Sequence, residues 1–137
     1  MYLERPLAAG NLELKNRLVM PPMATAKSDP GGLVTRELLD YYEDKTRDGC
    51  FSLVIVEHSY VMQQGKASEF QLSVADDEVI PGLSELSALL HRHGNKAVMQ
   101  INHAGSAALS SVTGIPVVGP SPVPNPAKGR EDLPEEL

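Results

Sequence analysis

The sequence is poor in cysteine and in long apolar runs, and each shortage excludes a class of protein. A single cysteine, Cys50, excludes an intrachain disulfide framework and any metal or iron–sulfur site built from several cysteines. The longest purely aliphatic run, Leu53–Val56, is far shorter than the roughly 20 residues that cross a bilayer. Residues 1–6 have no apolar core and do not resemble a signal peptide. These features predict a soluble, cytoplasmic protein with no membrane partner.

Basic residues are scarce as well. Twelve Lys and Arg against 18 Asp and Glu give a net charge of −6, which disfavours binding to a nucleic-acid backbone. Hydrophobic residues make up 42% and charged residues 22% of the chain, an ordinary composition for a folded protein. The 137 residues are therefore expected to form a single globular unit with a real core.

Apolar runs alternate with amphipathic segments along the chain. Strict alternation at residues 11–15 predicts a short strand or hairpin arm, and compact apolar runs predict buried strands at 18–20, 52–56 and 96–101. One helix is predicted after the N-cap Thr35 and ends near Gly49; another follows Asp76–Glu78 and ends at Gly94. Prolines and glycines predict an extended loop over 113–128, and residues 133–137 predict the first turn of a further helix.

Strands that alternate with helices predict parallel βαβ units. Three parallel strands and two complete helices leave both edges of the sheet open, although a parallel sheet needs cover on both faces. The sequence therefore suggests a piece of a larger fold, or a chain that a partner completes.

In βα architectures, reactive side chains gather where the strands end. Three such ends carry small, polar or histidine residues: Pro21–Ala24, Glu57–Ser59 and Gln100–His103. A histidine there, His58 or His103, serves as an acid, base or anion ligand, or is simply hydrogen-bonded into the fold. Gln100 either joins an internal polar network or reads a donor–acceptor edge such as the pyrimidine side of a flavin. Spacing alone leaves these alternatives open.

Other candidate sites have simpler explanations. The sequence has neither a Gly-Lys-Ser/Thr phosphate loop nor a GxGxxG motif after a strand. His91 and His93 point to different faces of a helix, so we interpret them as surface residues near its end and predict no metal site. Cys50 is expected to be a small core residue, and the acidic residues 76–78 mark a helix start.

Several segments carry a family resemblance. Residues 10–20 contain Leu14-Lys15-Asn16-Arg17, residues 77–83 read DEVIPGL, and residues 100–105 read QINHAG. With Pro22-Met23, these segments resemble the N-terminal part of the old yellow enzyme family, the NADH:flavin oxidoreductases that use FMN. The resemblance extends over essentially the whole chain.

The resemblance implies a fold and a cofactor site. The fold is an α/β, partial (β/α)8 TIM barrel: about the first three strands and two helices with an N-terminal hairpin. Residues 1–137 would be the N-terminal portion of this flavin-binding barrel, with the remainder absent. FMN would lie over the C-terminal strand ends, packed on Pro22, Met23 and Ala24 and near His58, while Gln100 bonds its pyrimidine edge.

Three positions depart from the family pattern. Ala24 stands where the family often has threonine or cysteine, His58 where it has a small residue, and Ser106 where many members have arginine. The catalytic residues and the phosphate-binding loops are expected in later strands, outside these 137 residues. We therefore expect the isolated chain to bind FMN weakly or not at all.

The implied activity is an ene- or dienoyl-reductase in which NAD(P)H reduces FMN and the flavin reduces an activated alkene, the small-molecule substrate. Two alternatives remain at this stage. The chain is a catalytically inert truncated piece, or a half-barrel that a second copy or a companion chain completes. Otherwise it is the N-terminal part of a multidomain FMN and iron–sulfur dehydrogenase of the trimethylamine dehydrogenase type.

Overall fold

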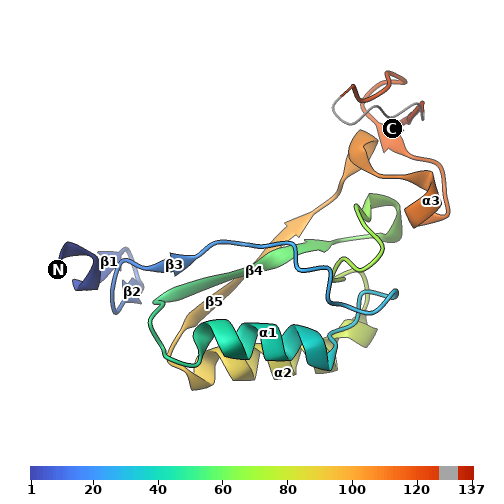
Figure 1. Cartoon of the computed structure of the whole chain (residues 1–137). Helices are drawn as coiled ribbons and strands as arrows, with labels where there is room; N and C mark the ends of the chain where they lie inside the picture. Colours follow the sequence, from blue (N-terminus) through green and yellow to red (C-terminus); the bar gives the residue numbers. More distant parts are fainter. Residues whose placement is uncertain (127–132) are drawn as a thin grey trace.

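A three-stranded parallel sheet with two helices on one face forms the body of the molecule. The computed structural model describes residues 1–126 and 133–137. The strands β3 (Val19–Met20), β4 (Leu53–Tyr60) and β5 (Lys96–Asn102) lie in the order β3-β4-β5. The helices α1 (Arg36–Thr46) and α2 (Ile80–Arg92) run side by side beneath this sheet (Figure 1). The predicted alternation of strands and helices is confirmed.

Both helices begin where the sequence predicts. The Thr35 side chain caps α1 by accepting a hydrogen bond from Leu38 N at 3.1 Å. The Asp76 side chain caps the 3-10 turn η3 (Asp77–Val79), which leads directly into α2. Pro81 lies in the first turn of α2, where its missing N–H has no intrahelical partner to lose.

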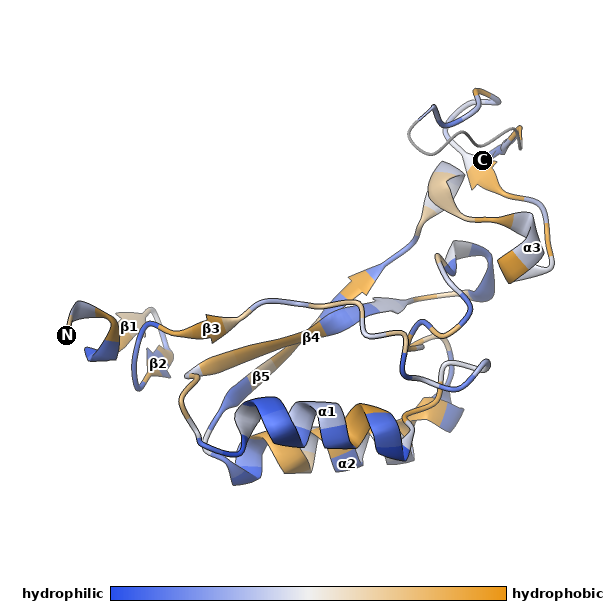
Figure 2. Cartoon of the chain, in the orientation of Figure 1, coloured by the Kyte–Doolittle hydropathy of each residue, from blue (hydrophilic) through white to orange (hydrophobic). Residues whose placement is uncertain are grey.

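The core lies between the sheet and the helices. Val54 and Val56 of β4 are buried against Leu38, Leu86 and Leu90 from α1 and α2. Figure 2 shows the first half of β4 as hydrophobic and the part around residues 57–59 as hydrophilic. Side chains alternate along a strand, so the intervening residues face the opposite side of the sheet.

That opposite face is open in the described structure. Val19 of β3 is 41% exposed and Val98, in the middle of β5, is 48% exposed, although both are aliphatic residues of parallel strands. We call this surface, with Leu53 and Ile55, the uncovered face. Parallel sheets are covered on both faces in complete folds, which agrees with the partial barrel that the resemblance implies.

Smaller elements extend from both ends of the sheet. The antiparallel hairpin of β1 (Leu7–Ala9) and β2 (Leu12–Leu14) lies at the N-terminal end, as predicted. The turn η1 (Tyr2–Glu4), which the sequence analysis did not predict, precedes it. Beyond the C-terminal ends of β4 and β5 lie, in chain order, η2 (Gln63–Gly65), η4 (Gly105–Ala107), α3 (Ser110–Thr113), β6 (Val118–Gly119) and β7 (Glu135–Glu136) (Figure 1). No helix among the described residues is long and apolar enough to cross a membrane.

Two expectations about the C-terminal region need correction. Residues 133–137 do not start a helix: β7 pairs in parallel with β6, and Glu135 N donates to Val117 O at 2.7 Å. Pairing with a strand distant in sequence overrides the local helix signal of Pro134 and the acidic residues after it. The predicted loop over 113–128 contains β6, and its residues 127–128 lie outside the described part of the chain.

The prediction for Cys50 was wrong as well. Its side chain is exposed, in the turn between α1 and β4. Gly49, with a φ of +61°, turns the chain back toward the sheet before the buried residues begin at Ser52. The Cys50 backbone oxygen accepts a hydrogen bond from Asn16 Nδ2 at 2.8 Å, so the backbone rather than the thiol is fixed in place.

Candidate functional site

A β-bulge brings His58 and Gln100 onto the same face of the sheet. Strand β4 runs on through Glu57–Ser59 to Tyr60, farther than its apolar run predicts. Val56 pairs with Met99 and Ser59 with Ile101, so Glu57 and His58 together lie opposite Gln100. Bulges of this kind re-aim side chains and are frequent next to active sites.

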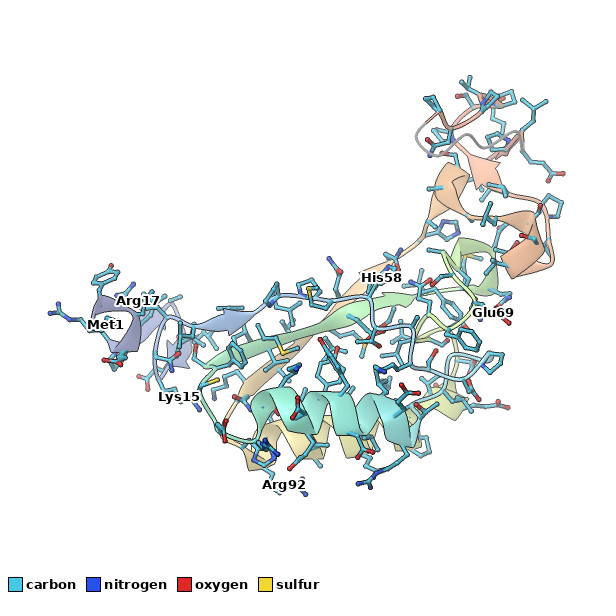
Figure 3. All side chains as sticks on the ribbon, viewed as in Figure 1. Met1, Lys15, Arg17, His58, Glu69 and Arg92 are labelled. Carbon is cyan, nitrogen blue, oxygen red and sulfur yellow. The ribbon has the colours of Figure 1, made fainter. Side chains whose placement is uncertain are left out.

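The bulge separates Glu57 from His58. Glu57 is only 1% exposed and contacts Tyr42 of α1, so its side chain faces the helices. His58 is half-buried, and Figure 3 shows it on the side of β4 away from α1 and α2. Gln100 is exposed, next to Val98 and Ile101 in β5. Of the two interpretations of Gln100, the structure therefore favours an available amide over one buried in an internal network.

The segment after β3 forms the adjacent wall of the site. Pro22 is half-buried, whereas Met23 is 53% exposed and Ala24 is exposed as well. Ala26 has a φ of +54°, a conformation that residues with a Cβ adopt at a cost of about 1 kcal/mol or more. The residues on either side of Ala26 are both hydrogen-bonded: Thr25 Oγ1 donates to Glu57, and Lys27 O accepts from Thr35 Oγ1.

Glu57 connects this wall to the strand and to the first helix. One carboxylate oxygen accepts from Thr25 Oγ1 at 2.7 Å and the other from Thr25 N at 3.4 Å. The Tyr42 hydroxyl accepts from Glu57 N at 2.9 Å and donates to the Glu57 carboxylate at 3.5 Å. A single buried carboxylate therefore links the segment after β3, the bulge in β4, and α1.

The burial of Glu57 makes stability depend on pH. Burial raises the pKa of the Glu57 carboxyl above its ordinary value, while the Thr25 hydrogen bonds oppose this rise. A raised carboxyl pKa contributes stability that is present below the ordinary value and lost as the pH rises through the folded value.

We therefore expect Glu57→Gln, which cannot ionise, to gain stability relative to the parent chain as the pH rises from about 4 to about 8. Urea unfolding of both chains across this range measures the difference in the free energy of unfolding. The conservative change Glu13→Gln, in the exposed hairpin, provides a control. A difference that stays constant with pH, or that moves in the opposite direction, would contradict this role for Glu57.

Two loops beyond the strand ends are fastened to each other by a buried cation. Lys66 is only 3% exposed; its Nζ donates to Pro30 O and lies 5.3 Å from the centre of the Tyr60 ring. Burial lowers the pKa of Lys66. The Tyr60 hydroxyl donates to Gly31 O at 2.8 Å. These contacts connect the loop after β3 with the loop after β4.

The sequence analysis missed Gln71, which lies in a segment interpreted only as a polar loop. Gln71 is 2% exposed, and its Oε1 accepts from Ala67 N at 2.7 Å. Its Nε2 donates to Asn102 Oδ1 at 2.8 Å and lies 3.2 Å from His58 O. Gln71 thus bridges the ends of β4 and β5. Nothing in the local sequence separates it from the neighbouring polar residues, because its partners are distant along the chain.

The remaining histidines each have a polar partner within the protein. His103 Nδ1 accepts from Gly105 N at 3.0 Å, which favours the structural interpretation of this residue. His91 Nδ1 lies 3.5 Å from Ser87 Oγ, and His93 Nε2 lies 2.9 Å from Glu43 Oε2, so the two rings contact different groups. Across residues 1–126 and 133–137, no group of three or more His, Cys, Asp or Glu could hold a metal ion.

Comparison with known proteins places this arrangement in a family. The model of the NADH:flavin oxidoreductase / NADH oxidase family matches residues 3–136. An NADH oxidase of Thermoanaerobacter brockii is 44% identical over 117 residues, which cover 84% of this chain and 18% of the relative. An NADPH dehydrogenase of Halalkalibacterium halodurans is 38% identical over 111 residues, which cover 80% of this chain and 32% of the relative. The chain thus spans less than a third of the length of either relative.

Solved structures agree on the fold. The old yellow enzyme homologue from Zymomonas mobilis superposes with a TM-score of 0.86 at 22% identity, covering 100% of this chain and 40% of that one. A 2-naphthoyl-CoA reductase superposes with a TM-score of 0.90 at 23% identity, covering 99% of this chain and 22% of that one. With the family model matching nearly every residue, the chain belongs to the NADH:flavin oxidoreductase / NADH oxidase family.

Proposed function

We propose that this chain forms the ring-contacting part of an FMN site in an NAD(P)H-dependent oxidoreductase that reduces activated alkenes. The exposed amide of Gln100, beside His58 at the C-terminal ends of parallel strands, is the observation that carries the proposal. The names of the two relatives support NADH and NADPH as reductants. The alkene as acceptor follows from the resemblance to old yellow enzymes.

The residues present suit a flat, partly polar ring. A carboxamide offers a carbonyl acceptor and two N–H donors, which complement the alternating carbonyl and N–H groups of a flavin pyrimidine edge. Met23 and Ala24 leave an exposed apolar surface and an accessible main chain on the adjacent wall. Parallel βα folds place ligands at this end of their strands.

Each residue has a defined task in this proposal. Gln100 orients the ring, Met23 and Ala24 pack against it, and Glu57 holds Thr25 and with it the strained backbone at Ala26. The cofactor, when bound, supplies the hydride chemistry between NAD(P)H and the alkene. This chain excludes water from one side of the ring and fixes its in-plane orientation.

A flavin titration of the chain, followed by ¹⁵N–¹H NMR, tests the proposal. We expect weak, saturable binding of both FMN and riboflavin with similar dissociation constants, because the described residues would contact the ring rather than the phosphate. Gln100→Ala should weaken binding about tenfold through loss of its hydrogen bonds to the ring. The matched change Gln64→Ala, whose amide donates to Pro116 O, should leave binding unchanged.

Two outcomes would contradict the proposal. The first is the absence of saturable changes in the chemical shifts of the protein at millimolar concentrations of FMN. The second is an equal effect of Gln100→Ala and Gln64→Ala, which would place the flavin away from the strand ends.

A further inference from the structure

The orientation of the Gln71 amide is determined by two backbone groups whose roles are unambiguous. Ala67 N can only donate, and it lies 2.7 Å from Gln71 Oε1. His58 O can only accept, and it lies 3.2 Å from Gln71 Nε2. A flipped amide would set donor against donor at Ala67 and acceptor against acceptor at His58.

This orientation also determines which nitrogen of His58 carries the proton. Gln71 Nε2, which can only donate, lies 3.3 Å from His58 Nδ1. Its two hydrogens serve three acceptors: Asn102 Oδ1 at 2.8 Å takes one, and His58 O at 3.2 Å and His58 Nδ1 share the other. A proton on Nδ1 would point at this N–H group, so a neutral ring carries its proton on Nε2. Burial lowers the pKa of His58 and so favours this neutral ring at neutral pH.

The other ring nitrogen of His58, Nε2, is not engaged by Gln71. In the part of the chain that the structure describes, no hydrogen bond to this nitrogen is found. The bulge sets His58 opposite Gln100 in the register of β4 and β5. Figure 3 shows His58 on the side of β4 away from α1 and α2, which is the uncovered face. The two side chains thus offer adjacent polar groups to a ligand over the strand ends.

We propose that His58 is a second side-chain contact to the flavin ring, donating from Nε2–H to a carbonyl or ring-nitrogen acceptor, and that Gln71 is the positioning residue that fixes this tautomer. The inference rests on the proposed function, since it concerns the same site.

The tautomer is tested on the chain itself by long-range ¹H–¹⁵N NMR of its histidine rings. The parent chain should show an unprotonated Nδ1 and a protonated Nε2 for His58. Gln71→Glu replaces the donor with an acceptor of the same size, so Nδ1 should become protonated. Gln64→Glu serves as the control and should leave the His58 signals unchanged. A protonated Nδ1 in the parent, or no change in Gln71→Glu, would overturn the role of Gln71.

The ring contact is tested by the riboflavin and FMN titrations. His58→Leu, which lacks a donor, should weaken binding of both flavins about tenfold. His58→Gln can place an N–H near the position of Nε2, so it should restore binding to within about threefold of the parent. Binding that depends on Gln100 but is the same for His58→Leu and the parent would overturn this inference alone. Loss of saturable binding in the parent would overturn the proposed function as well.

Discussion

Replacing Gly32 with alanine is expected to lower the free energy of unfolding by about 3 kcal/mol, the sum of backbone strain and overpacking. Gly32 has a φ of +85°, which strains any residue with a Cβ. A Cβ there would also lie 2.6 Å from Ser73 Cβ, 2.8 Å from the Tyr60 hydroxyl and 3.0 Å from Ser73 N. Ser73 N is a backbone atom, and it donates a hydrogen bond to Gly32 O at 2.9 Å. Neither of the two chain segments can therefore move away freely.

Gly10→Ala is the matched control for this prediction. Gly10 has a φ of +61°, but a Cβ there would meet nothing within 4 Å. We expect the free energy of unfolding to fall by only about 1 kcal/mol, from the backbone strain alone. Urea unfolding of the three chains gives the comparison. Equal losses at the two positions would show that the loop around Gly32 can open, and that the close approach of residues 32 and 73 contributes nothing to stability.

Tyr42→Phe is expected to cost about 2 kcal/mol, although it removes a single oxygen atom. Tyr42 is fully buried, and its hydroxyl accepts from Glu57 N at 2.9 Å and donates toward the Glu57 carboxylate. Phenylalanine keeps the ring packing but leaves a buried N–H without an acceptor and a buried carboxylate with one donor fewer. Burial already raises the pKa of Tyr42, so the hydroxyl stays protonated and available as a donor.

Tyr41→Phe provides a control in the same helix. Tyr41 is only half-buried and packs edge-to-face on Tyr42 with ring centres 5.3 Å apart, a contact that the substitution retains. We expect a change of less than about 0.5 kcal/mol. Thermal unfolding followed by circular dichroism measures the stability of both variants. The slope of the free energy of unfolding against urea concentration checks that the folded state is the same. If Tyr42→Phe lowers the free energy of unfolding no more than Tyr41→Phe does, the hydrogen bonds around Glu57 do not contribute to stability.

Most of the framework could be predicted from local sequence. Thr35 and Asp76 cap their helices because a side-chain oxygen three or fewer residues away satisfies a free backbone N–H, a contact that the sequence shows directly. Val54 and Val56 of β4, with Ala97 and Met99 of β5, pack against the helices as their composition predicts, whereas Val98 and Ile101 of β5 are exposed. The failures at Cys50 and at residues 133–137 have a common cause. Both depend on where the chain goes after a turn, and no local pattern encodes that.

The apolar runs and the polar residues that follow them placed His58 and Gln100 near the ends of two strands, and the register of β4 and β5 sets them on one face. Their contact with FMN stays a prediction. Their detailed environment could not be predicted in the same way. The bulge that separates Glu57 from His58 is a property of the register between β4 and β5. Gln71 reaches His58 across 13 residues and Asn102 across 31, so its importance is visible only once the chain is folded.

The sequence by itself determined the order of strands and helices, the helix caps, the acidic surface and the family, because these depend on composition and short spacings. The tertiary structure decided which polar residues are buried and which face the uncovered side of the sheet. Glu57, Lys66 and Gln71 look like ordinary surface residues in the sequence, yet each is at most 3% exposed. Burial makes their hydrogen bonds obligatory, and partners distant in sequence satisfy them, so only the folded chain shows how they hold the site together.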